Sequence, residues 1–287
     1  MRVLPPQEWH EQADTHYERV HEFANAARKR SACREKHPVF DFLTKYYPFS
    51  LGKFEKWQPG YGVTLEEADK ERFSEKRYHF DGNDCYLDLR RLTEKEAERF
   101  HFTHNLLTLT QARPGVYSCF GLHEWAMVYS GAEVRHRESA PLRMSQAEVD
   151  EFVRSRNLVC THFDAYRFFA PDTQELNKHQ PSLDDREKFE QPACIHVNMD
   201  LYKWAFKCAP WVGSDFIWDC FRLALQAREV DMKASPYDLS EWGYGSIKIE
   251  TEQGRSQYVQ AQRNLEVKGK ALRAQLIKQL SVILKKS

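Results

Sequence analysis

The stretch ACIHVNMDLYKWAFKC, residues 193–208, decides the fold class of this 287-residue chain. Its bulky apolar side chains recur every three or four residues, which is the period of an α-helix that buries one face. They are Ile195, Met199, Tyr202 and Phe206. The next segment, residues 214–230, repeats the period with Ile217, Phe221, Leu225 and Arg228 on one stripe. We therefore predict two successive helices in the core.

Further helices are expected on both sides of this pair. Residues 7–33 are predicted to form a largely polar helix with one apolar face, and residues 258–284 a long helix interrupted at Gly269. Helices starting at Thr93 and Ser145 each have a Glu three residues later, which is the pattern of a capping box. Residues 246–251, Ser-Ile-Lys-Ile-Glu-Thr, alternate with period two and predict a strand.

The predicted fold is mainly α: one globular helical domain with a few short strands, an α+β arrangement remaining open. No Pro-, Gly- or Ser-rich run is long enough to separate two cores. Within the domain we expect an N-terminal helical extension over residues 1–34, a main body over residues 35–265, and a C-terminal helix over residues 266–287.

The charge balance excludes a general attraction to polyanions. Lys plus Arg and Asp plus Glu number 42 each, so the formal net charge is zero and binding to DNA would need a local basic patch. The N-terminus has no apolar leader, and nowhere do 18 apolar residues run together, so no membrane partner is expected. Seven scattered cysteines without a CxxC pair favour a reducing, cytoplasmic location.

Histidines and carboxylates occur inside apolar stretches, where burial is costly unless they are paired. His162 and Asp164 are two residues apart and would share one face of a strand, whereas His196 and Asp200 would meet on one face of a helix. A carboxylate beside an imidazole suits a general base or a metal ligand. The candidate catalytic residues are these four and Asp231, which lies near the end of the second core helix.

The same residue types allow a mixed nitrogen and oxygen metal site. Its candidate ligands are His123, Glu124, His162, Asp164, His196 and Asp200. The cofactor is therefore either absent, the pairs simply satisfying one another, or a divalent iron, manganese or zinc ion. The chain has no HExxH, EF-hand, P-loop or GxGxxG motif to narrow the choice.

Other side chains are candidates for binding substrate. Asn198 lies between the two residues of the helical pair, and Tyr237 lies close to Asp231. Trp57 and Tyr61 belong to a turn-rich loop and could stack on a base. The basic side chains available for an anionic group are Arg113, Arg167 and Lys203.

Six stretches together resemble one protein family. They are HPVFDFL (37–43), WQPG (57–60), CFGLHEWAMVY (119–129), CTHFDAYRFF (160–169), HVNMDLYKW (196–204) and DMKASPYDL (231–239). The chain resembles, over most of residues 35–265, an uncharacterised and largely actinobacterial family labelled 3-methyladenine DNA glycosylase. The resemblance implies hydrolysis of the N-glycosidic bond of a modified nucleobase, with Asp164, Asp200 or Asp231 stabilising positive charge on the sugar and Trp57 stacking on the base.

Three functions of different classes therefore remain open. The first is N-glycosidic hydrolysis in DNA, RNA or a free nucleoside. The second is a metal-dependent oxygenase or hydrolase acting on a small molecule. The third is a non-catalytic ligand-binding protein with a satisfied polar core.

Overall fold

The centre of the molecule is helix α10, Ile195–Lys207, in which every residue from Ile195 to Ala205 is buried. The computed structural model describes residues 2–73, 76–131 and 140–286. A short loop connects α10 to α11, Ser214–Ala234, and these two helices share the most extensive contact between elements in the described chain. Both predicted core helices are therefore confirmed.

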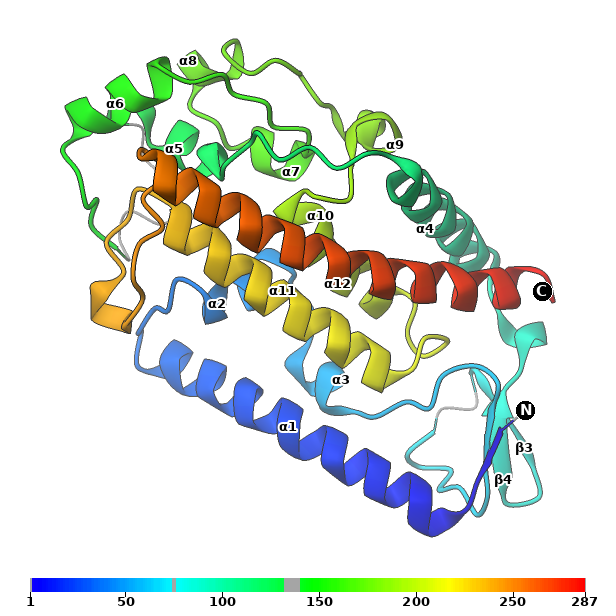
Figure 1. Cartoon of the computed structure of the whole chain (residues 1–287). Helices are drawn as coiled ribbons and strands as arrows, with labels where there is room; N and C mark the ends of the chain where they lie inside the picture. The colour runs from blue at the N-terminus through cyan, green and yellow to red at the C-terminus, as the bar shows by residue number, and fades with distance from the viewer. Residues whose placement is uncertain (1, 74–75, 132–139, 287) are drawn as a thin grey trace.

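Long helices cover this pair on two sides (Figure 1). Helix α12, Glu252–Leu284, lies across α10 and α11 and also contacts α4, Glu94–Ala112. Helix α1, Pro6–Ala32, packs against α11 together with α2, Phe40–Tyr46, and α3, Leu51–Glu55. The capping boxes predicted at Thr93 and Ser145 are both present.

Shorter helices close the end of the bundle where the candidate residues lie. They are α5, Leu122–Met127; α6, Gln146–Arg154; α7, Phe163–Tyr166; α8, Pro171–Gln174; and α9, Arg186–Phe189. Short 3-10 helices occur at Leu89–Arg91, Tyr129–Gly131, Leu183–Asp185 and Ser240–Trp242. Of these segments, α5, α7 and α9 carry His123, Asp164 and Arg186, whose side chains lie beside side chains of α10.

The described strands form one small sheet in the order β1-β2-β4-β3. They are β1, Arg2–Leu4; β2, Val63–Leu65; β3, Tyr78–Asp81; and β4, Asp84–Leu87. Strand β1 pairs parallel to β2, with Val3 opposite Thr64, and the other two pairings are antiparallel. The sheet lies at the N-terminal end of α1, away from the short helices (Figure 1).

The structure confirms a mainly α, single-domain fold, and one core contains residues from Leu4 to Ile283. Side chains of the segments 1–34 and 266–287, such as Trp9 and Leu276, belong to that core. Among the described helices, none is long and apolar enough to cross a membrane.

Two local predictions are wrong. Residues 246–251 do not form a strand, because the Ile247 N–H donates to the Lys233 carbonyl in a loop, and the alternation reflects burial of Ile247 and Ile249 alone. Gly269 does not interrupt α12. It is required there because α10 approaches so closely that a Cβ atom at Gly269 would lie 1.9 Å from Asn198 Oδ1.

We expect Gly269→Ala to lower the free energy of unfolding by about 1–3 kcal/mol, the usual cost of overpacking. The matched control is Gly52→Ala in α3, where the nearest atom to a new Cβ is Ser50 Oγ at 3.8 Å. That variant should be as stable as wild type or slightly more stable, because Ala favours a helix over Gly. Urea unfolding of both variants measures the difference, and equal stability would refute the close contact between α10 and α12.

A buried histidine ties α1 to α3. His16 has no exposed surface; its Nε2 lies 2.8 Å from the Phe54 carbonyl oxygen, and its Nδ1 lies 3.0 Å from Arg19 Nη2. Because Nδ1 accepts from the guanidinium, Nε2 carries the proton and donates to the carbonyl. Burial, together with the charge of Arg19, lowers the pKa of His16 below its ordinary 6.5.

This shift predicts a pH-dependent stability. The folded protein binds a proton at His16 less readily than the unfolded chain, so the contribution of neutral His16 is complete above pH 6.5 and declines as the pH falls below it. His16→Gln should be less stable than wild type at pH 7.5, by about 1–3 kcal/mol for the lost buried hydrogen bonds. The difference in free energy of unfolding between wild type and His16→Gln, measured by urea unfolding, should be smaller at pH 5.5. A gap that is constant with pH would contradict the assignment.

Candidate functional site

Helix α10 presents polar side chains to two separate clusters. His196 and Asp200 are one turn apart and both buried. His196 lies beside His123 of α5 and near Asp231 of α11, whereas Asp200 contacts His162, the residue that precedes α7. His196 and Asp200 therefore do not form a pair with each other. Each contacts residues of other elements.

The first cluster, which we name the inner triad, consists of His123, His196 and Asp231. Each offers one ligand-type atom, and these atoms lie within 4.8 Å of one another. The two imidazole rings are 4.5 Å apart between centroids and nearly perpendicular, at 77°. All three side chains are at least nine-tenths buried, Asp231 completely. The geometry is that of three ligand atoms around a common point.

The start of α5 sets the direction of His123. Gly121 immediately precedes this short helix with φ of +72°, a left-handed conformation that favours glycine. A Cβ atom there would also lie 3.3 Å from the Tyr258 ring and 3.4 Å from the Ala234 side chain. The tight turn therefore brings α5 against α11 and α12, so that His123 points into the interior.

Two atoms of the inner triad contact each other directly. His123 Nε2 and Asp231 Oδ1 are 2.8 Å apart, the distance of a hydrogen-bonded ion pair. This contact raises the pKa of His123 and lowers that of Asp231.

Arg228 contacts the inner triad through Asp231. Its Nη1 donates to Asp231 Oδ2 at 2.8 Å and to Glu124 Oε1 at 2.7 Å, and its guanidinium carbon lies 3.9 Å from the Phe42 ring centroid. Glu124 therefore lies beside the triad as a partner of Arg228, not among the triad's three atoms. Asp231 is fixed through one oxygen, which leaves its second oxygen directed at the histidines.

Burial and mutual charge perturb the inner triad. Burial, reinforced by the neighbouring His123, holds the pKa of His196 well below its ordinary value. Burial also lowers the pKa of His123, but the Asp231 carboxylate outweighs it and the net shift is upward. Burial would raise the pKa of Asp231, but His123, His196 and Arg228 together outweigh it and the net shift is downward.

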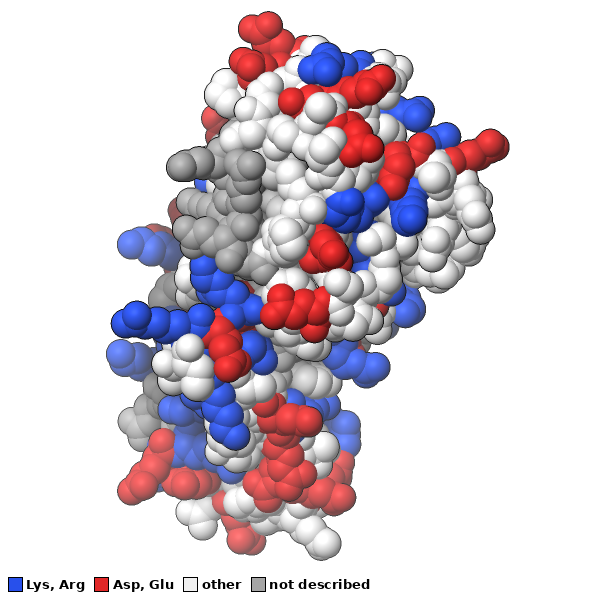
Figure 2. All heavy atoms as spheres, turned by 90° about the vertical axis from the view of Figure 1, so that its left-hand side faces the viewer, with Lys and Arg blue, Asp and Glu red and all other residues white. Residues whose placement is uncertain are grey.

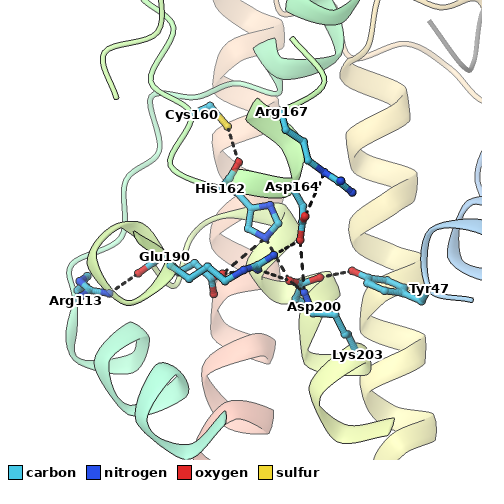
Figure 3. A network of polar contacts seen from close by, with 10 residues as sticks. Tyr47, Arg113, Cys160, His162, Asp164, Arg167, Glu190, Asp200 and Lys203 are labelled. Atoms are coloured by element: carbon cyan, nitrogen blue, oxygen red, sulfur yellow. Dashed lines mark hydrogen bonds and ion pairs between the residues drawn. The ribbon is translucent and has the colours of Figure 1, made fainter. Parts of the chain in front are cut away.

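The second cluster is an ion-pair network, which we name the outer network (Figure 3). It contains three carboxylates, Asp164, Asp200 and Glu190, two cations, Arg186 and Lys203, and His162. Arg186 Nη1 lies 2.9 Å from Glu190 Oε1 and 3.5 Å from Asp200 Oδ2, and Arg186 also contacts Asp164. Lys203 contacts Asp200, and the Tyr47 hydroxyl donates to Asp200 Oδ1 at 2.6 Å.

The carboxylates of the outer network are held by basic side chains. Burial would raise the pKa of Asp164 and of Asp200, but Arg186 and Lys203 outweigh it and hold both values below the ordinary one. His162, Asp164 and Asp200 also offer three ligand-type atoms within 4.8 Å. A metal ion there would lie against the two basic side chains that already occupy the same carboxylate oxygens. The geometry therefore favours a structural ion-pair cluster at this position.

The structure brings His162 and Asp164 together by a different route from the predicted strand. His162 is the residue before α7 and Asp164 lies in its first turn, so a helix start positions both. The His162 ring stacks on His196, with centroids 5.2 Å apart and planes 20° apart. The inner triad and the outer network are therefore adjacent, and these two imidazoles form their contact.

A small cavity adjoins the inner triad. Its volume of about 20 Å³ holds about one water molecule. His123 and His196 line it together with Tyr258, and three free cysteines, Cys119, Cys160 and Cys194, complete much of its wall. Burial raises the pKa of each of these thiols, so they are protonated at neutral pH.

A wider hollow of about 520 Å³ lies against the outer network, a volume in the range of small-molecule sites. Asp164, Arg186 and Lys203 belong both to its lining and to the outer network. Of the basic residues predicted to bind an anion, Lys203 is the one that lines this hollow. Arg167 lies 3.3 Å from Asp164, and Arg113 donates to the backbone carbonyls of Glu187 and Glu190.

The remaining predicted substrate residues lie elsewhere. Asn198 lies on another face of α10. Its Oδ1 accepts a hydrogen bond from Arg273 Nη2 at 2.9 Å, and its Nδ2 donates to the Pro192 carbonyl at 3.0 Å. Trp57 is 2% exposed and belongs to the core, and Tyr61 packs near Trp211. Tyr237 is 1% exposed. In this conformation neither Trp57 nor Tyr237 presents a free ring to a base.

Several site residues were missed from the sequence. Arg228 had a signal, because it continues an apolar stripe and a charged residue in such a position must be paired. Arg186 and Glu190 also had a signal, because they are an i,i+4 pair of opposite charge. Tyr47 and Tyr258 had none, because their contacts join segments far apart in the chain.

Comparison with protein-family models, with curated proteins and with solved structures found no match to this chain. The resemblance to the family labelled 3-methyladenine DNA glycosylase therefore stays a prediction, and the functional argument depends on the geometry.

Replacing Arg186 by Met should disrupt the outer network and lower the free energy of unfolding of the protein. It would leave Asp164, Asp200 and Glu190 in the interior with one basic partner fewer, and breaking a buried ion pair costs about 3–5 kcal/mol. Lys188→Met is the control two residues away, since Lys188 forms an exposed pair with Asp185 and should unfold as wild type does. Urea unfolding compares them, and an equal effect of both changes would argue against a stabilising role for Arg186.

Proposed function

We propose that this protein is a metal-dependent enzyme acting on a small molecule, with His123, His196 and Asp231 as the ligands of a divalent transition metal. One observation carries the proposal. His123, His196 and Asp231 are buried and each offers one ligand-type atom, and these three atoms lie within 4.8 Å of one another.

The donor set supports this assignment. Two histidines and one carboxylate are the usual protein ligands of catalytic zinc and of non-haem iron, and such a set leaves coordination positions open for water or substrate. The water-sized cavity borders both histidines and supplies that space. A metal with this ligand set activates a water molecule for hydrolysis or binds an oxygen of the substrate.

The charges of the buried groups around the inner triad also support a bound metal. Glu124 and Asp231 are carboxylates with 2% and 0% exposure, and Arg228 is the one guanidinium in contact with them. The buried group thus carries one excess negative charge, which is costly in a low-dielectric interior unless a cation compensates it. A divalent metal bound by the inner triad would supply that compensation.

Protonation of His123 would also balance the charge. Its Nε2 proton would then be donated to Asp231 Oδ1, 2.8 Å away. The metal content of the purified protein decides between a metal ion and an imidazolium at this position.

Three thiols beside the triad favour hydrolysis over oxygenation. Cys119, Cys160 and Cys194 line the same cavity as His123 and His196. Oxygen activation at that position would expose them to oxidation, whereas hydrolysis leaves them unchanged. We therefore place a zinc- or manganese-dependent hydrolase ahead of an iron-dependent oxygenase.

The other two functions have less support from the geometry. A DNA glycosylase stacks a flipped base on an accessible aromatic ring, but Trp57 is buried. Figure 2 shows basic and acidic side chains interspersed on one face of the molecule. A non-catalytic ligand-binding protein would account for the outer network, but it gives no reason for three buried ligand-type atoms within 4.8 Å of one another.

Elemental analysis of protein purified without an affinity tag or chelator tests the proposal. We expect close to one equivalent of zinc, manganese or iron per chain, and its loss in His123→Ala and Asp231→Asn. The matched control is His162→Ala, which removes a neighbouring buried imidazole from the outer network and should retain the metal. Circular dichroism establishes that each variant is folded.

Metal-free wild type would refute the proposed function, as would metal that persists in both triad variants. Loss of metal from His162→Ala, with retention in the triad variants, would move the site to the outer network. The identity of the metal then separates the two reactions, since zinc or manganese supports hydrolysis and iron supports oxygenation.

A further inference from the structure

The wider hollow beside the outer network has the size of a second ligand site. Its volume is about 520 Å³, within the range of small-molecule sites. Its walls include side chains of helix α10, Phe102 of α4 and side chains of residues 183–187. It shares no lining residue with the water-sized cavity of the inner triad. A small molecule therefore has room here that it lacks beside the triad.

Part of the hollow is an exposed apolar surface. Phe102 is 42% exposed and Leu183 is 58% exposed, and both line the hollow. The Phe102 ring meets Trp204 edge to face, with centroids 5.7 Å apart and planes at 61°. Apolar side chains exposed together in a concave surface are typical of a site for the apolar part of a ligand.

A basic side chain without a counter-ion also lines the hollow. Lys207 Nζ lies 5.3 Å from the Trp204 ring centroid, and no carboxylate of the described chain lies within ion-pair distance of it. Partial loss of solvent around its ammonium group and the charge of nearby Lys203 lower the pKa of Lys207 below its ordinary 10.5. The other two cations of the lining, Lys203 and Arg186, already contact carboxylates of the outer network. An anionic group of a ligand would therefore pair with Lys207.

A carboxylate without a partner lines the same space. Among the residues that the structure describes, none forms a hydrogen bond or an ion pair with the Asp184 side chain, whereas Glu187 accepts from Asn105 Nδ2 at 2.8 Å. The acidic and basic residues of the lining balance in formal charge: Asp164, Asp184 and Glu187 against Arg186, Lys203 and Lys207. A lining with no net charge favours a ligand with no net charge over a phosphate or another simple anion.

We propose that this hollow binds a small zwitterion with an apolar side chain, such as an aromatic amino acid. Its carboxylate would pair with Lys207, its ammonium group with Asp184, and its side chain would cover Phe102 and Leu183. Each contact uses a group or an apolar surface that the described chain leaves available. The inference does not depend on the proposed metal centre, because the two sites have different residues.

Calorimetric titration of the purified protein with three related compounds tests the inference. L-Phenylalanine carries both charges, 3-phenylpropionate lacks the ammonium group, and phenethylamine lacks the carboxylate. We expect wild type to bind L-phenylalanine more tightly than either of the other two, because only the amino acid pairs with both Lys207 and Asp184.

Two variants separate the two charged contacts. Lys207→Met should raise the Kd for L-phenylalanine and for 3-phenylpropionate about fivefold, between the effect of an exposed ion pair and that of a hydrogen bond to a charged group, without weakening phenethylamine. Asp184→Asn should weaken L-phenylalanine and phenethylamine to a similar degree and leave 3-phenylpropionate at least as tight. Lys188→Met is the matched control, since Lys188 pairs with Asp185, does not line the hollow and should bind all three as wild type does.

Both replaced side chains are exposed, so the variants should keep the Tm of wild type and a change in Kd reports on binding. Wild type that does not bind L-phenylalanine would overturn the site, whatever its metal content. Binding that neither variant weakens would remove Lys207 and Asp184 from it. Tighter binding of 3-phenylpropionate than of L-phenylalanine would overturn the zwitterion in favour of a simple carboxylate.

Discussion

The structure depends on the burial of polar side chains along helix α10. A helix covered on all sides must pair each buried charge and amide within the protein, because water cannot do so. Side chains from other elements therefore contact the polar residues of α10. His123 of α5 contacts His196, Arg273 of α12 contacts Asn198, and His162, just before α7, contacts Asp200. These pairings fix how the outer helices are placed around α10, so the same contacts define both the fold and the candidate site.

The two clusters on α10 differ in which groups contact their carboxylates. In the outer network, two basic side chains, Arg186 and Lys203, contact Asp200 together with Tyr47 and His162. In the inner triad, Arg228 contacts one oxygen of Asp231 and the imidazole of His123 contacts the other. A metal ion in the outer network would lie against two cations, whereas in the inner triad it would lie between a carboxylate and two imidazoles. This difference, more than the residue types, distinguishes the site proposed to be functional from the one proposed to be structural.

The sequence predicted what depends on local periodicity. Residues 193–208 and 214–230 formed the expected core helices, and the capping boxes at Thr93 and Ser145 marked true helix starts. The sequence did not predict which of the site residues contact one another. His196 and Asp200 share a helix face by spacing, yet tertiary packing gives them different partners, and Asp231 joins His123 across two helices. The alternation at residues 246–251 misled because burial in a loop can produce the same period as a strand.

The walls of the small cavity are of two kinds, and this bears on how a substrate would reach the proposed metal site. His123, His196 and Tyr258 lie on helices packed in the core. Val116 and residues 158–161 also line the cavity and lie outside helices. Enzymes commonly keep reacting groups on rigid elements and let loops adapt to substrate. Under the proposed function, a substrate larger than water would reach the triad only if these loop residues moved, because the cavity of about 20 Å³ holds about one water molecule.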